Sequence, residues 1–136
     1  PDFTQVDFNT LLSKSDIISI HAPLNPATNN LFTFETFRKM KKTSILINVG
    51  RGPIVNEGDL VKALEENEIA GAGLDVLSVE PMEKKNPLLT FKDSSRLIIT
   101  PHIAWASIEA RNRLVEEVYK NIEAYMNGEE RNRVNP

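Results

Sequence analysis

Residues 45–53 read ILINVGRGP, and this stretch decides the fold class. Residues 45–49 are nearly all apolar, and Gly50 then breaks the run. A short, continuous apolar run bounded by glycine and proline is typical of a strand that is buried on both faces, as in a parallel sheet. We therefore expect such a strand over 45–49, followed by a glycine-flanked turn that carries Arg51.

Strand-like and helical patterns alternate on both sides of this stretch. Further strands are predicted at 17–21, 70–76 and 96–100, and short helices are expected after Asp7, Thr33 and Asn56. Strands that alternate with helices indicate βαβ units, so the predicted fold class is α/β with a mainly parallel sheet. Residues 77–94 are expected to form a long polar loop.

The last part of the chain predicts one long helix. Ser107 is a capping residue, apolar residues then recur every three or four positions, and Gly128 stands where helices commonly end. The polar tail 129–136 is expected to be loose.

Composition limits the classes of function. The chain has 136 residues, of which 40% are apolar, and its formal net charge is −3, so we expect one modest folded domain without a basic nucleic-acid-binding face. No apolar run approaches the length of about 20 residues that crosses a membrane. There is no cysteine and there are only two histidines, so no metal site is expected. The absence of cysteine is compatible with the cytoplasm, where we expect the protein to work.

Chemically useful side chains follow the predicted strands. They are His21, Arg51, Asp75, Glu80 and His102. Ligands of parallel α/β sheets bind outside the carboxyl ends of the strands, so these residues predict a site at that edge.

Each of these residues also has a purely structural interpretation. Arg51 is either an exposed turn residue or, as we favour, a fork that grips a carboxylate. Glu80 is either a solvated loop acid or the partner of His102, which would then be an acid/base catalyst. Asp75 is either a turn carboxylate or an acceptor for a bound amide. His21 either ends its strand or contacts a cofactor.

Three ordered motifs resemble those of the D-isomer-specific 2-hydroxyacid dehydrogenases. They are NVGRGPIVN at 48–56, AGAGLDV at 70–76 with the Glu-Pro pair at 80–81, and TPHIAWAS at 100–107. The segment 21–24 with Thr28 is similar to the preceding loop of that family. The IAWAS ending and the EAR sequence at 109–111 most resemble the glycerate dehydrogenase (hydroxypyruvate reductase) branch.

The resemblance implies hydride transfer between NAD(P)H and a small 2-keto or 2-hydroxy acid, with hydroxypyruvate or glyoxylate as substrate and NAD or NADP as cofactor. Arg51 would bind the substrate, His102 would be the acid/base and Glu80 its partner. Asp75 would hold the nicotinamide carboxamide. The residues expected to contact the cofactor are His21, Pro23, Thr28, Val49, Gly50, Arg51, Asp75, His102 and Ala104.

The sequence lacks the Gly-x-Gly-x-x-Gly turn of this family and the acidic residue that reads the adenosine ribose. We therefore expect half of a Rossmann-type doubly wound sheet. Residues 1–106 would be the carboxyl-terminal half of the NAD(P)-binding domain, and 107–136 the C-terminal helix and tail. Because the sequence starts at Pro1, we expect a processed chain, a fragment or an engineered piece of a homodimeric enzyme, inactive in isolation.

Two alternatives stay open. One is an enzyme similar to formate dehydrogenase, although a glutamine would suit the position of Glu80 better there. The other is a dinucleotide-sensing corepressor or interaction module. The balanced charge and the lack of a disordered partner-binding tail argue against this alternative.

Overall fold

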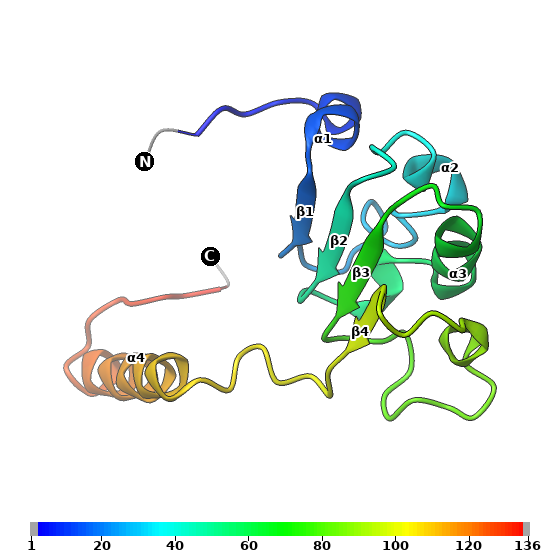
Figure 1. Cartoon of the computed structure of the whole chain (residues 1–136). Coiled ribbons are helices and arrows are strands. Elements are labelled where there is room, and N and C mark those ends of the chain that lie inside the picture. The colour runs from blue at the N-terminus through cyan, green and yellow to red at the C-terminus, as the bar shows by residue number, and fades with distance from the viewer. Residues whose placement is uncertain (1–2, 135–136) are drawn as a thin grey trace. The chain divides into compact units, whose positions relative to one another are not determined.

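The computed structural model describes residues 3–134. It divides into two compact units, Pro1–His102 and Ile103–Pro136. The first unit holds the sheet and the second holds the long helix (Figure 1). The predicted functional division into 1–106 and 107–136 stays a prediction.

A four-stranded sheet forms the centre of the first unit. Its strands are β1 (Ile17–Ile20), β2 (Ile45–Asn48), β3 (Gly71–Leu74) and β4 (Leu97–Ile99). They lie in the order β1-β2-β3-β4, and every neighbouring pair is parallel. All four predicted strands and the α/β class are confirmed. Parallel pairing brings all the carboxyl ends to one edge of the sheet.

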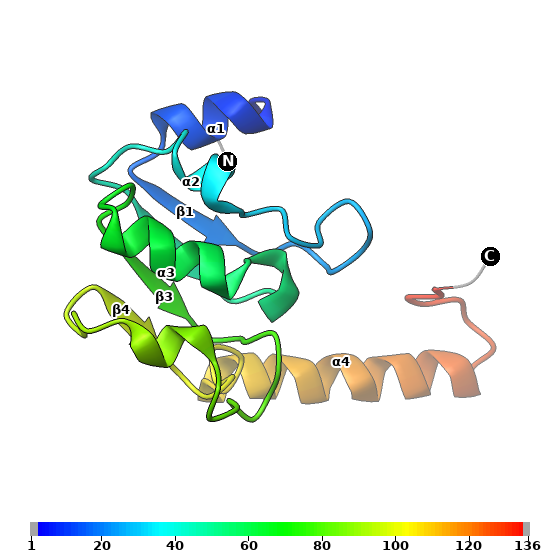
Figure 2. The same cartoon turned by 90° about the vertical axis from the view of Figure 1, so that its right-hand side faces the viewer.

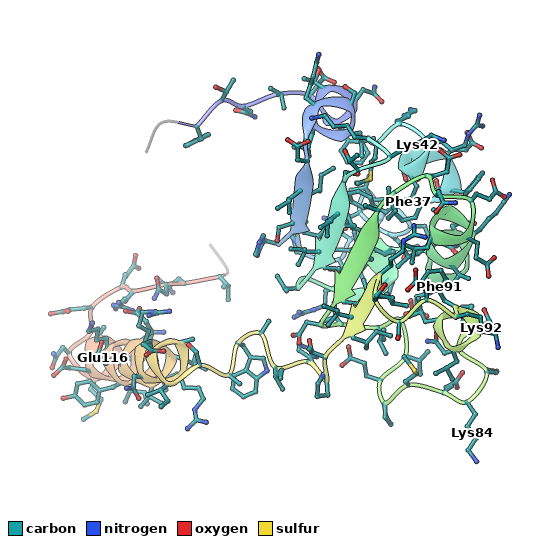
Figure 3. All side chains as sticks on the ribbon, in the orientation of Figure 1. Phe37, Lys42, Lys84, Phe91, Lys92 and Glu116 are labelled. Carbon is teal, nitrogen blue, oxygen red and sulfur yellow. The ribbon has the colours of Figure 1, made fainter. Side chains whose placement is uncertain are left out.

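Three helices lie beside one another on one face of this sheet (Figure 2). They are α1 (Phe8–Lys14), α2 (Phe34–Phe37) and α3 (Glu57–Glu65). The predicted caps are present, because the Asp7 and Asn56 side chains accept the backbone N–H groups of the residues three positions later. The core lies between this face and the helices, and Phe37 points into it (Figure 3).

The expectation that the 45–49 strand is buried on both faces is wrong for the described part of the first unit. Leu46 and Asn48 are buried, but Ile45 is 40% exposed. On the same face as Ile45, Ile98 of β4 is 65% exposed. The strand order explains this, because successive right-handed crossovers that progress in one direction along a sheet place their helices on the same side.

The predicted polar loop 77–94 is more ordered than expected. It contains the 3₁₀ turn η2 (Pro87–Thr90), which the Asn86 side chain caps by accepting the N–H of Leu88. Leu88 is buried in the core. A second 3₁₀ turn, η1 (Gly52–Ile54), follows β2. Leu77, Met82 and Phe91 of this segment also pack against the core, so the apolar residues scattered through a polar segment were the overlooked signal.

In the second unit, α4 (Ile108–Met126) begins after Ser107 and ends before Gly128, as predicted. The tail, which we expected to be loose, makes hydrogen bonds to α4 within the described residues 129–134. The Arg131 guanidinium donates hydrogen bonds to Asn121 and Glu117 of α4, and the N–H of Glu129 donates to the Ala124 carbonyl. Among the described residues, no helix combines the length and the apolar character that a membrane crossing requires.

Candidate active site

Two predicted site residues lie at the carboxyl ends of the neighbouring strands β3 and β4. Asp75 follows β3 directly, and its side chain is only 6% exposed. Its Oδ1 accepts a hydrogen bond of 2.5 Å from the Thr100 hydroxyl, just after β4. The backbone N–H of His102 donates to the Asp75 carbonyl at 2.9 Å, so the parallel pairing continues beyond the strands and brings His102 to this edge.

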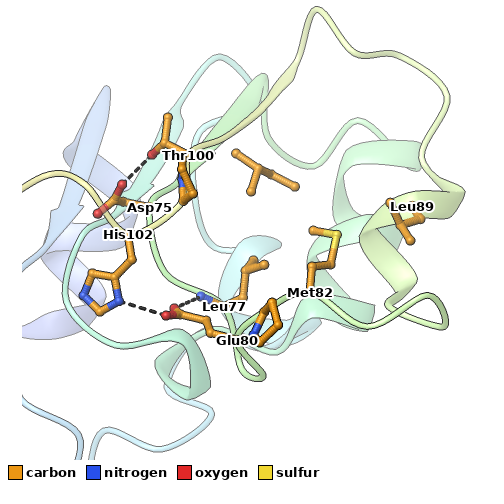
Figure 4. A pocket seen from close by; sticks show the side chains of 10 residues that line it. Asp75, Leu77, Glu80, Met82, Leu89, Thr100 and His102 are labelled. Atoms are coloured by element: carbon orange, nitrogen blue, oxygen red, sulfur yellow. Dashed lines mark hydrogen bonds and ion pairs between the residues drawn. The ribbon is translucent and has the colours of Figure 1, made fainter.

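His102 and Glu80 form a pair although they are 22 positions apart in the sequence. The Nδ1 atom of His102 lies 2.8 Å from one carboxylate oxygen of Glu80, and the other oxygen accepts the Leu77 N–H at 2.9 Å (Figure 4). The His102 backbone has a φ of 55°, in the left-handed region. Both side chains remain partly exposed, at 43% for His102 and 36% for Glu80, so a ligand can reach the pair.

The surroundings of Glu80 keep it ionised. The backbone N–H of Leu77 and then the hydrogen bond from His102 lower the pKa of the Glu80 carboxyl from its usual 4.5. An ionised carboxylate only accepts hydrogen bonds, so Nδ1 of His102 is the donor in this pair. Proton exchange with a ligand therefore falls to Nε2, which points away from Glu80 (Figure 4).

A cavity of about 560 Å³ adjoins this pair. His102, Glu80 and Asp75 lie at one end of it, and Met82 and Leu89 lie toward the other (Figure 4). The remaining lining residues are Leu77, Pro81, Ile99, Thr100 and Pro101. A largely apolar wall strengthens electrostatic interactions of the few polar groups that face it.

Arg51 lies in a second hollow of about 510 Å³, which His21, Pro23, Val49 and Gly50 also line. Its guanidinium donates to the Gly50 carbonyl at 2.8 Å.

The side chain of the fully buried Asn48 stabilises this turn through hydrogen bonds to its backbone. Its amide donates to the Arg51 carbonyl at 3.0 Å, and its Oδ1 accepts the Gly50 N–H at 3.1 Å. Asn48 was not singled out from the sequence, because a lone amide in an apolar strand carries no distinctive pattern.

The structure thus groups the predicted residues into two sets. Asp75, Glu80 and His102 share the first cavity, and most of the expected cofactor contacts share the second hollow. Arg51 does not line the first cavity, so its convergence with Glu80 and His102 on one substrate stays a prediction.

Two expected cofactor residues are not among the residues that line either hollow. The Thr28 hydroxyl donates to the Pro23 carbonyl at 2.7 Å and so stabilises the loop that carries Pro23. Ala104 belongs to the second unit.

Gly52 explains part of the glycine pattern around Arg51. A Cβ on Gly52 would lie 1.9 Å from the Leu77 carbonyl group, so no other residue fits at this position. The room at Gly52 is therefore taken by the backbone of the loop that carries Glu80. The Arg51 turn and the Glu80 loop are in direct contact here.

Comparison with known proteins decides the family. Residues 1–104 match the family described as "D-isomer specific 2-hydroxyacid dehydrogenase, NAD binding domain". The chain belongs to this family.

Among the described residues, no group of three or more His, Asp or Glu side chains is arranged to hold a metal ion.

Curated relatives and solved structures agree with this assignment. The chain is 49% identical over 129 residues to a glyoxylate reductase of Thermofilum pendens, covering 95% of this chain and 37% of that protein. It is 44% identical over 127 residues to a glycerate dehydrogenase of Methylorubrum extorquens, covering 93% and 40%. The D-isomer specific 2-hydroxyacid dehydrogenase of Lactobacillus delbrueckii ssp. bulgaricus, solved in complex with NAD, superposes with a TM-score of 0.81 at 32% identity and covers 93% and 41%. The chain therefore spans about two fifths of these proteins.

The chemistry of the two hollows fits part of a nicotinamide dinucleotide. The buried Asp75 carboxylate offers an acceptor for an amide N–H, and the second hollow offers the Arg51 guanidinium and the His21 imidazole to polar or anionic groups. Both lie after strands of a parallel sheet, where such folds bind ligands.

Proposed function

We propose that this chain is the catalytic part of an NAD(P)-dependent dehydrogenase that reduces a small 2-keto acid. Hydroxypyruvate and glyoxylate are the proposed substrates, giving D-glycerate and glycolate. The Glu80–His102 pair at the rim of an apolar cavity carries the proposal, because a carbonyl reductase needs a positioned proton donor. The names of the two curated relatives support the substrate class.

Each residue has a separate task in this proposal. A reduced nicotinamide, when bound, would supply the hydride that the keto carbon receives. His102 donates a proton from Nε2 to the substrate carbonyl oxygen, while Glu80 stabilises the positive imidazolium through Nδ1. Arg51 binds the substrate carboxylate. Asp75, whose carboxylate accepts a hydrogen bond from the Thr100 hydroxyl, would accept a hydrogen bond from the cofactor amide.

The test is turnover by the full-length protein. NADH and NADPH are each offered with hydroxypyruvate, glyoxylate or pyruvate, and NAD⁺ is offered with formate. We expect oxidation of reduced cofactor with hydroxypyruvate or glyoxylate. Oxidation of formate would instead support the formate dehydrogenase alternative. Partner binding without turnover would support the corepressor alternative.

The variant that tests the proposed proton donor is His102→Asn. Asparagine tolerates the left-handed backbone conformation at this position, so the fold should persist while the proton donor is lost. We expect the rate of keto-acid reduction to fall by roughly 10²- to 10⁴-fold. A folded His102→Asn variant with the parental rate would remove the basis of the proposal.

The assembly and location of the protein are also proposals. We propose a homodimer in the cytoplasm, and sedimentation equilibrium of the full-length protein measures the first of these. A single monomeric species at micromolar concentration would contradict it.

A further inference from the structure

A carboxylate outside the predicted site holds both sides of the loop that carries Glu80. One oxygen of Glu57 accepts the backbone N–H of Ser78 at 2.7 Å, and the other accepts the side-chain amide of Asn86 at 2.9 Å. Glu80 lies between these two attachment points in the sequence. Glu57 itself stands in the first turn of α3, so the loop is tied to a helix that packs on the core.

We propose that Glu57 is a positioning residue that orients Glu80 and, through Glu80, His102. This inference rests on the proposed function, because it assigns a further residue to the same reaction. Glu57 does not line either hollow and touches no reacting atom.

The first attachment point lies next to the hydrogen bond that orients Glu80. The Leu77 N–H donates to Glu80, and the following N–H, of Ser78, donates to Glu57. Two successive peptide groups thus face two carboxylates. Because a peptide unit is planar, a shift of the Ser78 N–H moves the Leu77 carbonyl with it and disturbs the local backbone that holds Glu80.

The second attachment point fixes the far side of the loop. Asn86 is only 7% exposed, and its Oδ1 is already used to cap η2 through the N–H of Leu88. Its amide nitrogen therefore faces Glu57 as a donor and needs an acceptor there. A carboxylate satisfies both Ser78 and Asn86, whereas a glutamine side chain presents one acceptor and one donor.

The turn that carries Arg51 also contacts the start of the Glu80 loop, at Leu77 and Ser78. The Gly52 backbone packs against Leu77 and Ser78, so the segment that Glu57 holds lies between the Glu80 pair and the Arg51 turn. Glu57 is thus placed to fix the position of the proposed proton donor, His102, relative to Arg51, the proposed carboxylate-binding residue.

The same turn of α3 offers a matched control. Asp59 is also a first-turn carboxylate, and its Oδ2 accepts the N–H of Phe34 at 3.0 Å. It therefore contributes a similar charge and a similar long-range hydrogen bond, but toward α2 instead of the Glu80 loop. A general effect of helix-terminal charge would appear in both Glu57→Gln and Asp59→Asn.

The kinetic experiment compares these variants in the full-length protein. We expect Glu57→Gln to lower kcat for keto-acid reduction roughly tenfold and to leave KM for the reduced cofactor within about twofold. Its pH optimum for reduction should move toward acidic pH, in the same direction as that of Glu80→Gln. Asp59→Asn should keep the parental kcat and pH profile.

A double-mutant cycle separates positioning from general stability. If Glu57 acts through Glu80, adding Glu57→Gln to Glu80→Gln should change kcat by less than about twofold. Equal effects of Glu57→Gln in the presence and absence of Glu80, or a folded Glu57→Gln with the parental kcat and pH profile, would overturn the inference. If Glu57→Gln fails to fold, Glu57→Asp replaces it in the same cycle with the same criteria.

An activity-free measurement keeps this inference separable from the proposed function. The ring-proton NMR signals of His102 in the full-length protein are assigned by comparison with His102→Asn. We expect Glu57→Gln to shift the His102 signals and Asp59→Asn to leave them unchanged. A shift without any turnover of the parental protein would reject the proposed function alone. Unchanged His102 signals in folded Glu57→Gln would overturn the positioning role.

Discussion

At the scale of residues, the proposed chemistry depends on pairs of residues that lie far apart in the sequence. Glu80 and His102 are 22 positions apart, and Asp75 and Thr100 are 25 apart. The rule that parallel strands end at one edge predicted the neighbourhood of Glu80 and His102, but the individual hydrogen bonds needed the fold. Thr100 and Glu57 were missed because a threonine at a strand end and an acid in a first helical turn are common structural features.

The Glu80–His102 pair predicts a change in pH dependence. Glu80→Gln removes the negative partner that stabilises the imidazolium of His102. We therefore expect the optimum for keto-acid reduction by the full-length protein to move to more acidic pH. Initial rates across a pH series measure this. An unchanged profile would reject the role of Glu80 as the partner of His102.

The lowered pKa of Glu80 also predicts a pH-dependent stability. The folded pKa lies below the usual 4.5, so the ionised group stabilises the folded chain above pH 4.5, and this contribution is lost as the pH falls through the folded pKa. The unfolding free energy lost on Glu80→Gln should therefore be largest above pH 4.5 and shrink on acidification. Urea unfolding at several pH values tests this, with Glu65→Gln on α3 controlling for net charge. The prediction would be wrong if the loss of unfolding free energy caused by Glu80→Gln grew as the pH falls.

At the scale of elements, the strands and helix caps were predictable because their signals are local. The burial of one sheet face was mispredicted, since β-branched runs look alike whether one face or both are covered. The turn η2 was missed because its one buried apolar side chain, Leu88, lies within a polar segment. The contact between the Arg51 turn and the Glu80 loop is also an element-level feature, decided by Gly52.

Gly52 gives a test of that contact. A Cβ on Gly52 would meet the Leu77 backbone at 1.9 Å, which no side-chain movement can relieve. We expect Gly52→Ala to lower the unfolding free energy by about 3 kcal/mol and to disturb the His102 NMR signals.

Gly58→Ala is the matched control for this test. Its added Cβ meets only the Asn56 side chain, at 3.5 Å, and alanine favours the helix, so stability should rise by about 0.5–1 kcal/mol. Equal stability of the two variants would refute the close approach.

At the scale of the whole molecule, the sheet carries the residues proposed for acid/base catalysis and substrate binding, and the sequence contains no Gly-x-Gly-x-x-Gly turn. The relatives that it matches are about two and a half times as long, at a coverage of 37% to 41%. A dinucleotide held by only part of its usual contacts must still lose its translational and conformational freedom.

We therefore predict that the isolated 136-residue chain does not turn over hydroxypyruvate or glyoxylate with NADH. The pyrophosphate of the cofactor would lack its helix-terminal binding turn, so ordering the cofactor is too costly. Isothermal titration with NADH should show no binding at micromolar concentration. Turnover by the isolated chain at a rate within tenfold of the full-length protein would refute the prediction.

The sequence by itself determined the alternation of strands and helices, the caps that begin α1, α3 and α4, and the residues that follow each strand. These are consequences of local periodicity and of side-chain to backbone hydrogen bonds within a few positions. Only the tertiary structure decided that Glu80 meets His102, that Glu57 holds the loop that carries Glu80, and that Gly52 lies against Leu77. Those contacts join residues 21 to 29 positions apart, and their geometry follows from sheet order and packing, which no local pattern encodes.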